Sequence, residues 1–189
     1  MSNNKNDGYG LKKGEGIKIN FRGTKMTLKV SGSDSEGNYS LIEMIHPPNT
    51  GPALHIHSNA PEAYYVLEGN YSIKCGDREY QSQYGGFVFI PNGISHSYQS
   101  GLQGGKVLVI SPAELEGYFK EVEDILFSQW KEISWNQEVE IAQRYGQEFL
   151  DSLKHCTWFY IFEKKLMVLR NNYDFIIWLY KSYFYILEI

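Results

Sequence analysis

Two histidines, His55 and His57, are separated by a single residue. Because side chains alternate between the two faces of a strand, a His-x-His pair in a strand points both imidazoles into the same space. A third histidine, His96, follows the turn sequence Pro91-Asn92-Gly93 and begins a new strand, from which it can reach the same space across a barrel. The pattern fits either a site in which these side chains act together or a pair of polar side chains that only form hydrogen bonds within the fold.

A carboxylate stands close to these histidines in the sequence. Glu62 follows His57 by five positions, which would place it on the opposite face of an uninterrupted strand. The intervening Asn59-Ala60-Pro61 has turn or bulge chemistry, so the alternation can be reset between the two residues. Glu62 can therefore face inward with the imidazoles.

The elements around these residues have the composition of short strands and turns. Residues 1–112 contain 16 of the 18 glycines and all six prolines. The stretches between them are β-branched or aromatic, and the candidate strands are 16–21, 25–30, 39–45, 63–67, 71–75, 86–90 and 106–110. This pattern is typical of a β-barrel or β-sandwich.

Helices are expected after the strands. In Ser111-Pro112-Ala113-Glu114, a capping serine, a first-turn proline and a glutamate three residues after the cap predict a helix start. A second helix is predicted from Ser134, with Gln137 three residues on and Gly146 as its stop. Both helices are expected to pack outside the sheet.

The spacing of these residues resembles a known family. The residues that carry the resemblance are Gly51, His55, His57, Glu62 and Gly69, followed by Gly85, Pro91, Gly93 and His96. They are similar to the paired signatures of the cupin superfamily over residues 35–112, with Gly86 where Asp is usual and Ser100 where Asn is frequent. Residues 62–69 and 144–149 further resemble small single-domain cupins similar to quercetin dioxygenase. The fold class implied is mainly β, a double-stranded β-helix (cupin or jelly-roll barrel), here with C-terminal helices.

The resemblance implies that His55, His57, Glu62 and His96 are metal ligands. Three imidazoles and a carboxylate suit a divalent transition metal, namely Fe, Mn, Ni, Cu or Zn, and leave two octahedral positions open for substrate and dioxygen. The alternative is a metal-free cupin that retains only the polar cluster. Glu62 is also the candidate catalytic base, against the alternative of a purely structural ligand.

Two tyrosines are candidates for a substrate pocket. Tyr64 has the strand parity of Glu62 and Tyr98 has that of His96, so both are expected to point inward, either to contact an aromatic ligand or simply to pack. Met44, Phe87 and Phe89 are expected in the core. His46 and His155 are expected on the surface.

The composition shift along the chain suggests four segments. They are an N-terminal arm with edge strands (1–34), a barrel core (35–112), a helical segment (113–155) and an atypical tail (156–189). The tail contains 11 of the 29 aromatic residues, and its apolar runs are cut by charges, so no transmembrane segment is expected. Three alternatives for the tail are a helix on the barrel exterior, an interface or membrane-surface segment, and a non-native extension.

Charge and cysteine content exclude several classes. The 22 acidic and 18 basic residues give a net charge of −4, which argues against nucleic-acid binding through bulk charge. Two cysteines without a CxxC motif, and no leader-like start, predict a reducing cytoplasmic location. The stretches 17–21 and 25–30 would offer exposed edges for a homodimer.

Two functions are therefore weighed. One is a dioxygenase acting on a flavonol-like or enolic small molecule, with Glu62 as base. The other is a non-oxidative metal-binding cupin, either an isomerase or cyclase or a small-molecule sensor. The fold alone does not determine function, so a measurement must distinguish the two. Only the dioxygenase would consume oxygen.

Overall fold

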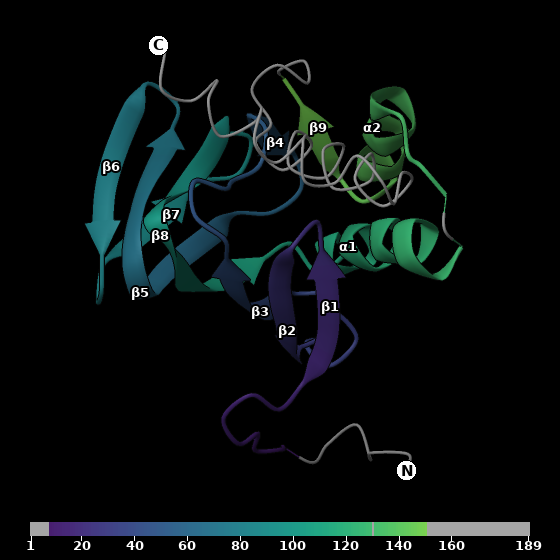
Figure 1. Cartoon of the computed structure of the whole chain (residues 1–189), viewed down its shortest axis with the longest axis horizontal. Coiled ribbons are helices and arrows are strands. Elements are labelled where there is room, and N and C mark those ends of the chain that lie inside the picture. The colour runs from purple at the N-terminus through teal and green to yellow at the C-terminus, as the bar shows by residue number, and fades with distance from the viewer. Residues whose placement is uncertain (1–7, 130, 151–189) are drawn as a thin grey trace, which may run out of the picture.

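Nine antiparallel strands form one curled sheet in the computed structural model, which describes residues 8–129 and 131–150 (Figure 1). The strands are β1 (Ile17–Phe21), β2 (Thr24–Val30), β3 (Ser40–His46), β4 (His55–His57), β5 (Glu62–Cys75), β6 (Arg78–Gln83), β7 (Phe87–Ile90), β8 (His96–Ser111) and β9 (Gln147–Phe149). The predicted mainly β fold of a cupin barrel with C-terminal helices is confirmed. The strands β6 and β9 have no counterpart among those predicted from the sequence.

The long strand β8 holds the sheet together. Along one edge it pairs first with β4, at His96 and His55, and later with the whole of β3. Along its other edge it pairs with β5 almost from end to end. Because β3, β4 and β5 all pair with this one twisted strand, the sheet curls and brings distant chain segments to face a common interior.

The strand β5 corrects one prediction. Residues 63–67 and 71–75, expected as two strands, belong to one strand with register irregularities around Gly69. Gly69 has a φ of +80°, and a Cβ there would lie 2.5 Å from the carbonyl oxygen of Gly104. Gly69 therefore serves as a bulge that bends a continuous strand, where turn chemistry alone suggested a break.

A second glycine explains the departure from the usual second signature. A Cβ at Gly86 would lie 2.2 Å from Ser82 Oγ and 2.8 Å from the carbonyl oxygen of Gln83. The turn is instead closed by backbone hydrogen bonds, with the Gly86 amide donating to Gln83 and its carbonyl accepting from Val66. An aspartate does not fit this turn, which is held without a carboxylate.

The core lies on the concave side of the sheet. Its fully buried aliphatic residues alternate along the strands and include Ile42, Val66, Ile73, Val107 and Val109. Each contributes about 1.5–3 kcal/mol by leaving water.

The prediction that Phe87 and Phe89 belong to this core is wrong. Their side chains are 59% and 54% exposed, while Val88 and Ile90 are buried. Strand alternation allows only one of the two sets to face inward, and in β7 that set is the aliphatic one.

Two short helices follow the sheet. They are α1 (Leu115–Glu123), which continues into the π-helical turn η1 (Asp124–Ser128), and α2 (Trp135–Arg144). The predicted helix start at Ser111 is wrong, because Ser111 ends β8 and its hydroxyl lies 2.8 Å from that of Ser40, while α1 has Glu114 at its N-cap. The second start is confirmed, since Ser134 and Gln137 form a reciprocal capping box.

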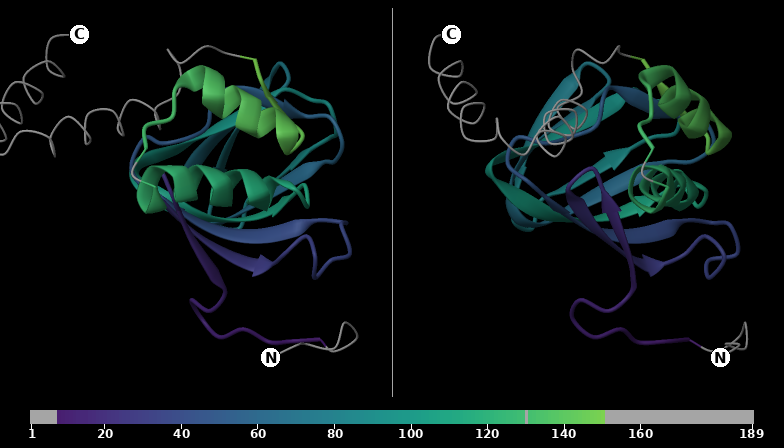
Figure 2. Two further views of the ribbon diagram at one scale, coloured as in Figure 1. Left: turned by 90° about the vertical axis from the view of Figure 1, so that its right-hand side faces the viewer. Right: turned by 45° about the vertical axis from the view of Figure 1, so that its right-hand side comes forward.

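The helices close the open side of the curled sheet. Figure 2 shows α1 and α2 side by side across that opening. Leu115, Tyr118 and Phe119 of α1 are buried against the core, and β9 pairs with β4. A buried ion pair between Arg22 and Glu138 joins the β1–β2 turn to α2. The helices therefore form a wall of the interior space as well as an outer layer.

The sheet edge differs from the prediction that both N-terminal strands offer free edges. Strand β2 lies between β1 and β3 and is paired on both sides, so of these two strands only β1 has an unpaired edge in the described structure. No helix within 8–129 and 131–150 has the length and apolarity to cross a membrane. The tail 156–189 and His155 lie outside the described residues.

Candidate metal centre

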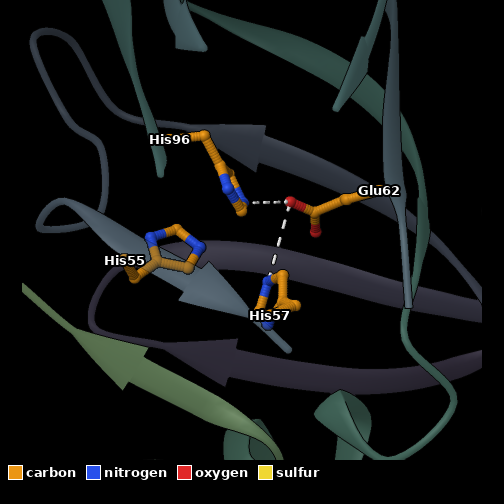
Figure 3. A group of neighbouring side chains, drawn as sticks. All are labelled: His55, His57, Glu62 and His96. Atoms are coloured by element: carbon orange, nitrogen blue, oxygen red, sulfur yellow. Dashed lines mark hydrogen bonds and ion pairs between the residues drawn. The ribbon is translucent and has the colours of Figure 1, made fainter. Parts of the chain in front are cut away.

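Four buried side chains point toward one another inside the barrel (Figure 3). They are His55 and His57 of β4, Glu62 at the start of β5 and His96 at the start of β8. One potential ligand atom from each lies within 4.8 Å of the others. The set singled out from the sequence is therefore brought together in space.

Strand pairing accounts for the positions of the imidazoles. His55 and His57 alternate with Ile56 in β4 and share one face, as predicted from the spacing. His96 is the residue directly opposite His55 across the β4–β8 pairing, and the centroids of their rings are 4.2 Å apart. Two chain segments about forty residues apart are thus joined by backbone register.

The carboxylate completes the cluster. Glu62 Oε2 lies 3.0 Å from His96 Nε2 and 3.8 Å from His57 Nε2, and Tyr64 donates its hydroxyl hydrogen to the same oxygen. Because Glu62 begins a new strand after the turn at 58–61, the predicted reset of alternation is confirmed.

Hydrogen bonds fix the orientation of two rings. The Nδ1 atoms of His55 and His96 each donate to a backbone carbonyl two residues earlier, at Ala53 and Ile94, both at 2.8 Å. These bonds direct each Nε2 toward the cluster, the arrangement found around metal-bound histidines. His57 Nε2 is buried without a hydrogen-bonding partner in the described residues. A buried unpaired nitrogen is costly in a protein, and a cation bound by the four donors would satisfy it.

The charges within the cluster are strongly coupled. Burial lowers the pKa of His55 well below its usual value and also lowers that of His57. Burial raises the pKa of Glu62, but the hydrogen bond from His96 and the nearby imidazoles outweigh it and bring the pKa to about 2. Burial opposes protonation of His96, but its bond to Glu62 raises its pKa. The site therefore presents an ionised carboxylate beside His55 and His57, whose neutral rings have the unprotonated nitrogen that a metal requires.

A small cavity opens beside the cluster, and about 30 Å³ of it is accessible to the centres of water-sized molecules. Glu62 and His55 form part of its wall, and so do Tyr64 and Tyr98, the two tyrosines predicted to point inward. Much of the remaining wall is aromatic and comes from the C-terminal elements, through Tyr118, Phe119, Trp135 and Phe149. The space next to the donors is thus narrow, and more of its lining is apolar than polar.

Two residues near this space were not identified from the sequence. Glu138 lies in the cavity wall, where it accepts hydrogen bonds from Tyr118 and Arg22. His46, expected on the surface, is only 3% exposed and contacts two buried tyrosines. Its strand parity with Ile42 and Met44 was the signal that could have located it, whereas the neighbouring prolines suggested a surface turn.

The family comparison agrees with this geometry. Residues 42–110 match the family model described as a cupin domain. This chain contains a cupin domain. The matched residues contain all four donors of the cluster, and the helical wall of the cavity lies outside them.

One curated relative and two solved structures are similar to this chain. It is 24% identical to quercetin 2,3-dioxygenase from Bacillus subtilis (strain 168) over 117 residues, which are 61% of this chain but 35% of that protein. An RmlC-like cupin from Shewanella frigidimarina is similar, with a TM-score of 0.49 and 15% identity over 59% of this chain and 96% of that one. The polyketide cyclase RemF from Streptomyces resistomycificus gives a TM-score of 0.48 and 22% identity, over 57% of this chain and 80% of that one. This cupin therefore spans about a third of its curated relative.

Proposed function

We propose that this cupin is a metal-dependent dioxygenase that acts on a flavonol-like or enolic small molecule. The observation that carries the proposal is a set of four buried donors, two of which, His55 and Glu62, line an aromatic-walled cavity. The similarity to quercetin 2,3-dioxygenase is consistent with it. His55, His57, Glu62 and His96 would hold Fe, Mn, Ni, Cu or Zn, which would supply open coordination positions for substrate and dioxygen.

Glu62 is the catalytic residue in this proposal. Its carboxylate is ionised, and it lies in the wall of the cavity. It accepts the proton of an enolic or phenolic hydroxyl, which leaves the substrate oxygen anionic and its carbon skeleton electron-rich. Tyr64, which donates to Glu62 Oε2, holds the carboxylate in place for this transfer.

The cavity walls account for the proposed substrate class. Tyr64 and Tyr98 line the cavity near the metal cluster, and Phe119, Trp135 and Phe149 line it from the C-terminal elements. Flat aromatic substrates bury their faces against such rings. We therefore propose that segment 113–155 works together with the barrel core 35–112 as one functional unit.

The test is oxygen consumption by the full chain, freed of metal and reloaded separately with Fe(II), Mn, Ni, Cu and Zn. With a flavonol as substrate, we expect oxygen uptake for at least one redox-active metal and none for Zn. His57→Ala treated in the same way serves as the control. Flavonol binding without oxygen uptake in any form would favour the non-oxidative function, as an isomerase, cyclase or small-molecule sensor.

A homodimer and a cytoplasmic location are part of the same proposal. Among the described strands, one edge of β1 has no partner and could pair with a second copy. Light scattering at micromolar concentration would show twice the monomer mass, and a monomer mass would contradict the dimer.

A further inference from the structure

A buried histidine outside the metal cluster links two tyrosines. His46 Nδ1 lies 2.9 Å from the hydroxyl of Tyr71, and His46 Nε2 lies 2.9 Å from the hydroxyl of Tyr98. Burial lowers the pKa of His46 to about 3, so the ring is neutral and carries one N–H hydrogen. Tyr98 lines the cavity beside the four donors, whereas Tyr71 is not among the residues that line it. The three side chains form a hydrogen-bonded path that ends at the cavity wall.

The hydroxyl partners determine the direction of this path. In the described residues the Tyr71 hydroxyl has His46 as its one hydrogen-bonding partner. The Tyr98 hydroxyl has a further acceptor, the sulfur of Met44, at 3.8 Å. If Tyr98 donated to His46, the imidazole would donate to Tyr71, whose own hydrogen would then be buried without an acceptor. If Tyr71 donates to Nδ1 and Nε2–H donates to Tyr98, every hydrogen has an acceptor. This arrangement therefore has the lower free energy.

The second arrangement has a consequence for the cavity. With its oxygen occupied by the His46 N–H, Tyr98 directs its own hydrogen toward Met44, and both residues line the cavity. A thioether sulfur is a weak acceptor. A ligand oxygen placed beside it, particularly an anionic or carbonyl oxygen, would form a stronger hydrogen bond and take over that hydrogen.

We propose that Tyr71 and His46 are positioning residues that turn the hydroxyl hydrogen of Tyr98 into the cavity, where it binds an acceptor oxygen of the ligand. The inference rests on the proposed function, since it assumes an oxygen-bearing ligand at the metal cluster. It assigns that ligand two oxygens, one toward the metal and one accepting from Tyr98. Removing Tyr71 should weaken ligand binding although Tyr71 itself does not reach the cavity.

The direction of the path is tested by NMR without any ligand. Long-range proton–nitrogen spectra of the Zn-loaded full chain labelled in histidine distinguish a protonated ring nitrogen from an unprotonated one, and His46→Gln identifies the His46 signals. We expect a hydrogen on Nε2 and none on Nδ1. In Tyr71→Phe the donor to Nδ1 is gone, and we expect the hydrogen to move wholly or partly to Nδ1. Protonation of Nδ1 in the wild type would overturn the proposal.

The role of Tyr98 is tested with acetylacetone, a small enolisable diketone, on the Zn-loaded protein, in which zinc performs no oxygen chemistry. Calorimetry should show binding about tenfold weaker in Tyr98→Phe, as expected for a lost hydrogen bond of about 1.4 kcal/mol, and a smaller loss in the same direction in Tyr71→Phe. The matched control is Tyr65→Phe, an exposed tyrosine of the same strand as Tyr71, which should bind like the wild type. Thermal unfolding of each variant verifies that it is folded.

The outcomes separate this inference from the dioxygenase proposal. Binding that depends on Tyr98 and Tyr71, with no flavonol oxygenation, would support the inference and reject the dioxygenase. Flavonol oxygenation with acetylacetone affinity unchanged in Tyr98→Phe would do the reverse. Absence of acetylacetone binding by the wild type would also overturn the inference.

Discussion

The barrel contains two buried groups of histidines that differ in their partners. His55, His57 and His96 gather around the carboxylate of Glu62, and the cluster contains a nitrogen without a hydrogen-bonding partner in the described residues. His46 lies against two tyrosine hydroxyls, and both of its ring nitrogens have partners. Both groups are buried. The difference is that both ring nitrogens of His46 have hydrogen-bonding partners, whereas the other group has the donors that could hold a cation.

This contrast shows that burial of a histidine by itself does not indicate a metal. What distinguishes the metal cluster is the convergence of several donors, with the outer nitrogens of two rings held by backbone carbonyls. His46 has the opposite arrangement, since hydroxyls that can donate and accept surround a single ring. Such a ring suits a hydrogen-bonding path better than a ligand.

The largest expected effect separates the two groups by metal content. His57→Ala and His96→Ala should bind metal more than about 100-fold more weakly than the wild type. Replacing a residue that only hydrogen-bonds to a metal ligand typically lowers metal affinity by about 10–100-fold, and loss of a ligand should exceed this. Elemental analysis after gel filtration measures this. His46→Gln is the matched control and should retain the metal of the wild type. Equal metal content in all three variants would remove the ligand assignment.

The next effect concerns stability in the presence of metal. A metal at about 100 times its dissociation constant should stabilise the fold by about 2.7 kcal/mol. For a chain of this size that corresponds to a rise in Tm of about 5–10 °C. Calorimetry with and without Zn should show this rise in the wild type and in His46→Gln, and its absence in His57→Ala. A rise of the same size in His57→Ala would place the metal elsewhere.

A smaller effect is the pH dependence that His46 contributes to stability. Its pKa is about 3 in the folded chain and about 6.5 when unfolded, so the unfolded chain binds more protons between these values. The stability that His46 contributes is fully present above pH 6.5 and is lost as the pH falls below it, at about 1.4 kcal/mol per pH unit.

Urea unfolding of the metal-free chain between pH 7 and 5 measures this loss. His55 and His57 also have lowered pKa values and contribute to the total slope, so the comparison with His46→Gln isolates one group. The variant should have a shallower slope, by about 1 kcal/mol per pH unit on average over this range and by about 1.4 at its acid end. Identical slopes would mean that His46 is not held neutral by burial.

The smallest expected effect is that of removing the C-terminal tail. Truncation after His155 should leave the metal content and the Tm unchanged, because the described residues already supply both histidine groups and a cavity wall. Solubility should improve, since the tail is rich in aromatic residues. Loss of folding on truncation would show that the tail completes the core.

The sequence by itself determined the local features of this cupin. The His-x-His spacing puts His55 and His57 on one face of β4, because side-chain alternation follows from backbone geometry alone. The capping box of Ser134 and Gln137 is likewise local, since both partners lie within one helical turn. The paired signatures identified the four candidate ligands, although their convergence required the pairing of β4, β5 and β8.

Only the tertiary structure decided which face of each element is buried. Periodicity gives two faces to β7, and packing left Phe87 and Phe89 in solvent, against the expectation from residue type. His46 is buried because Tyr71 of β5 and Tyr98 of β8 pack against it. Its neighbouring prolines predict a surface turn and do not indicate these contacts. The residues of the cavity wall could not be predicted from the sequence either, because α1, α2 and β9 are distant in sequence from the candidate ligands. Alternation is a property of the chain, whereas burial depends on which distant segment packs against it.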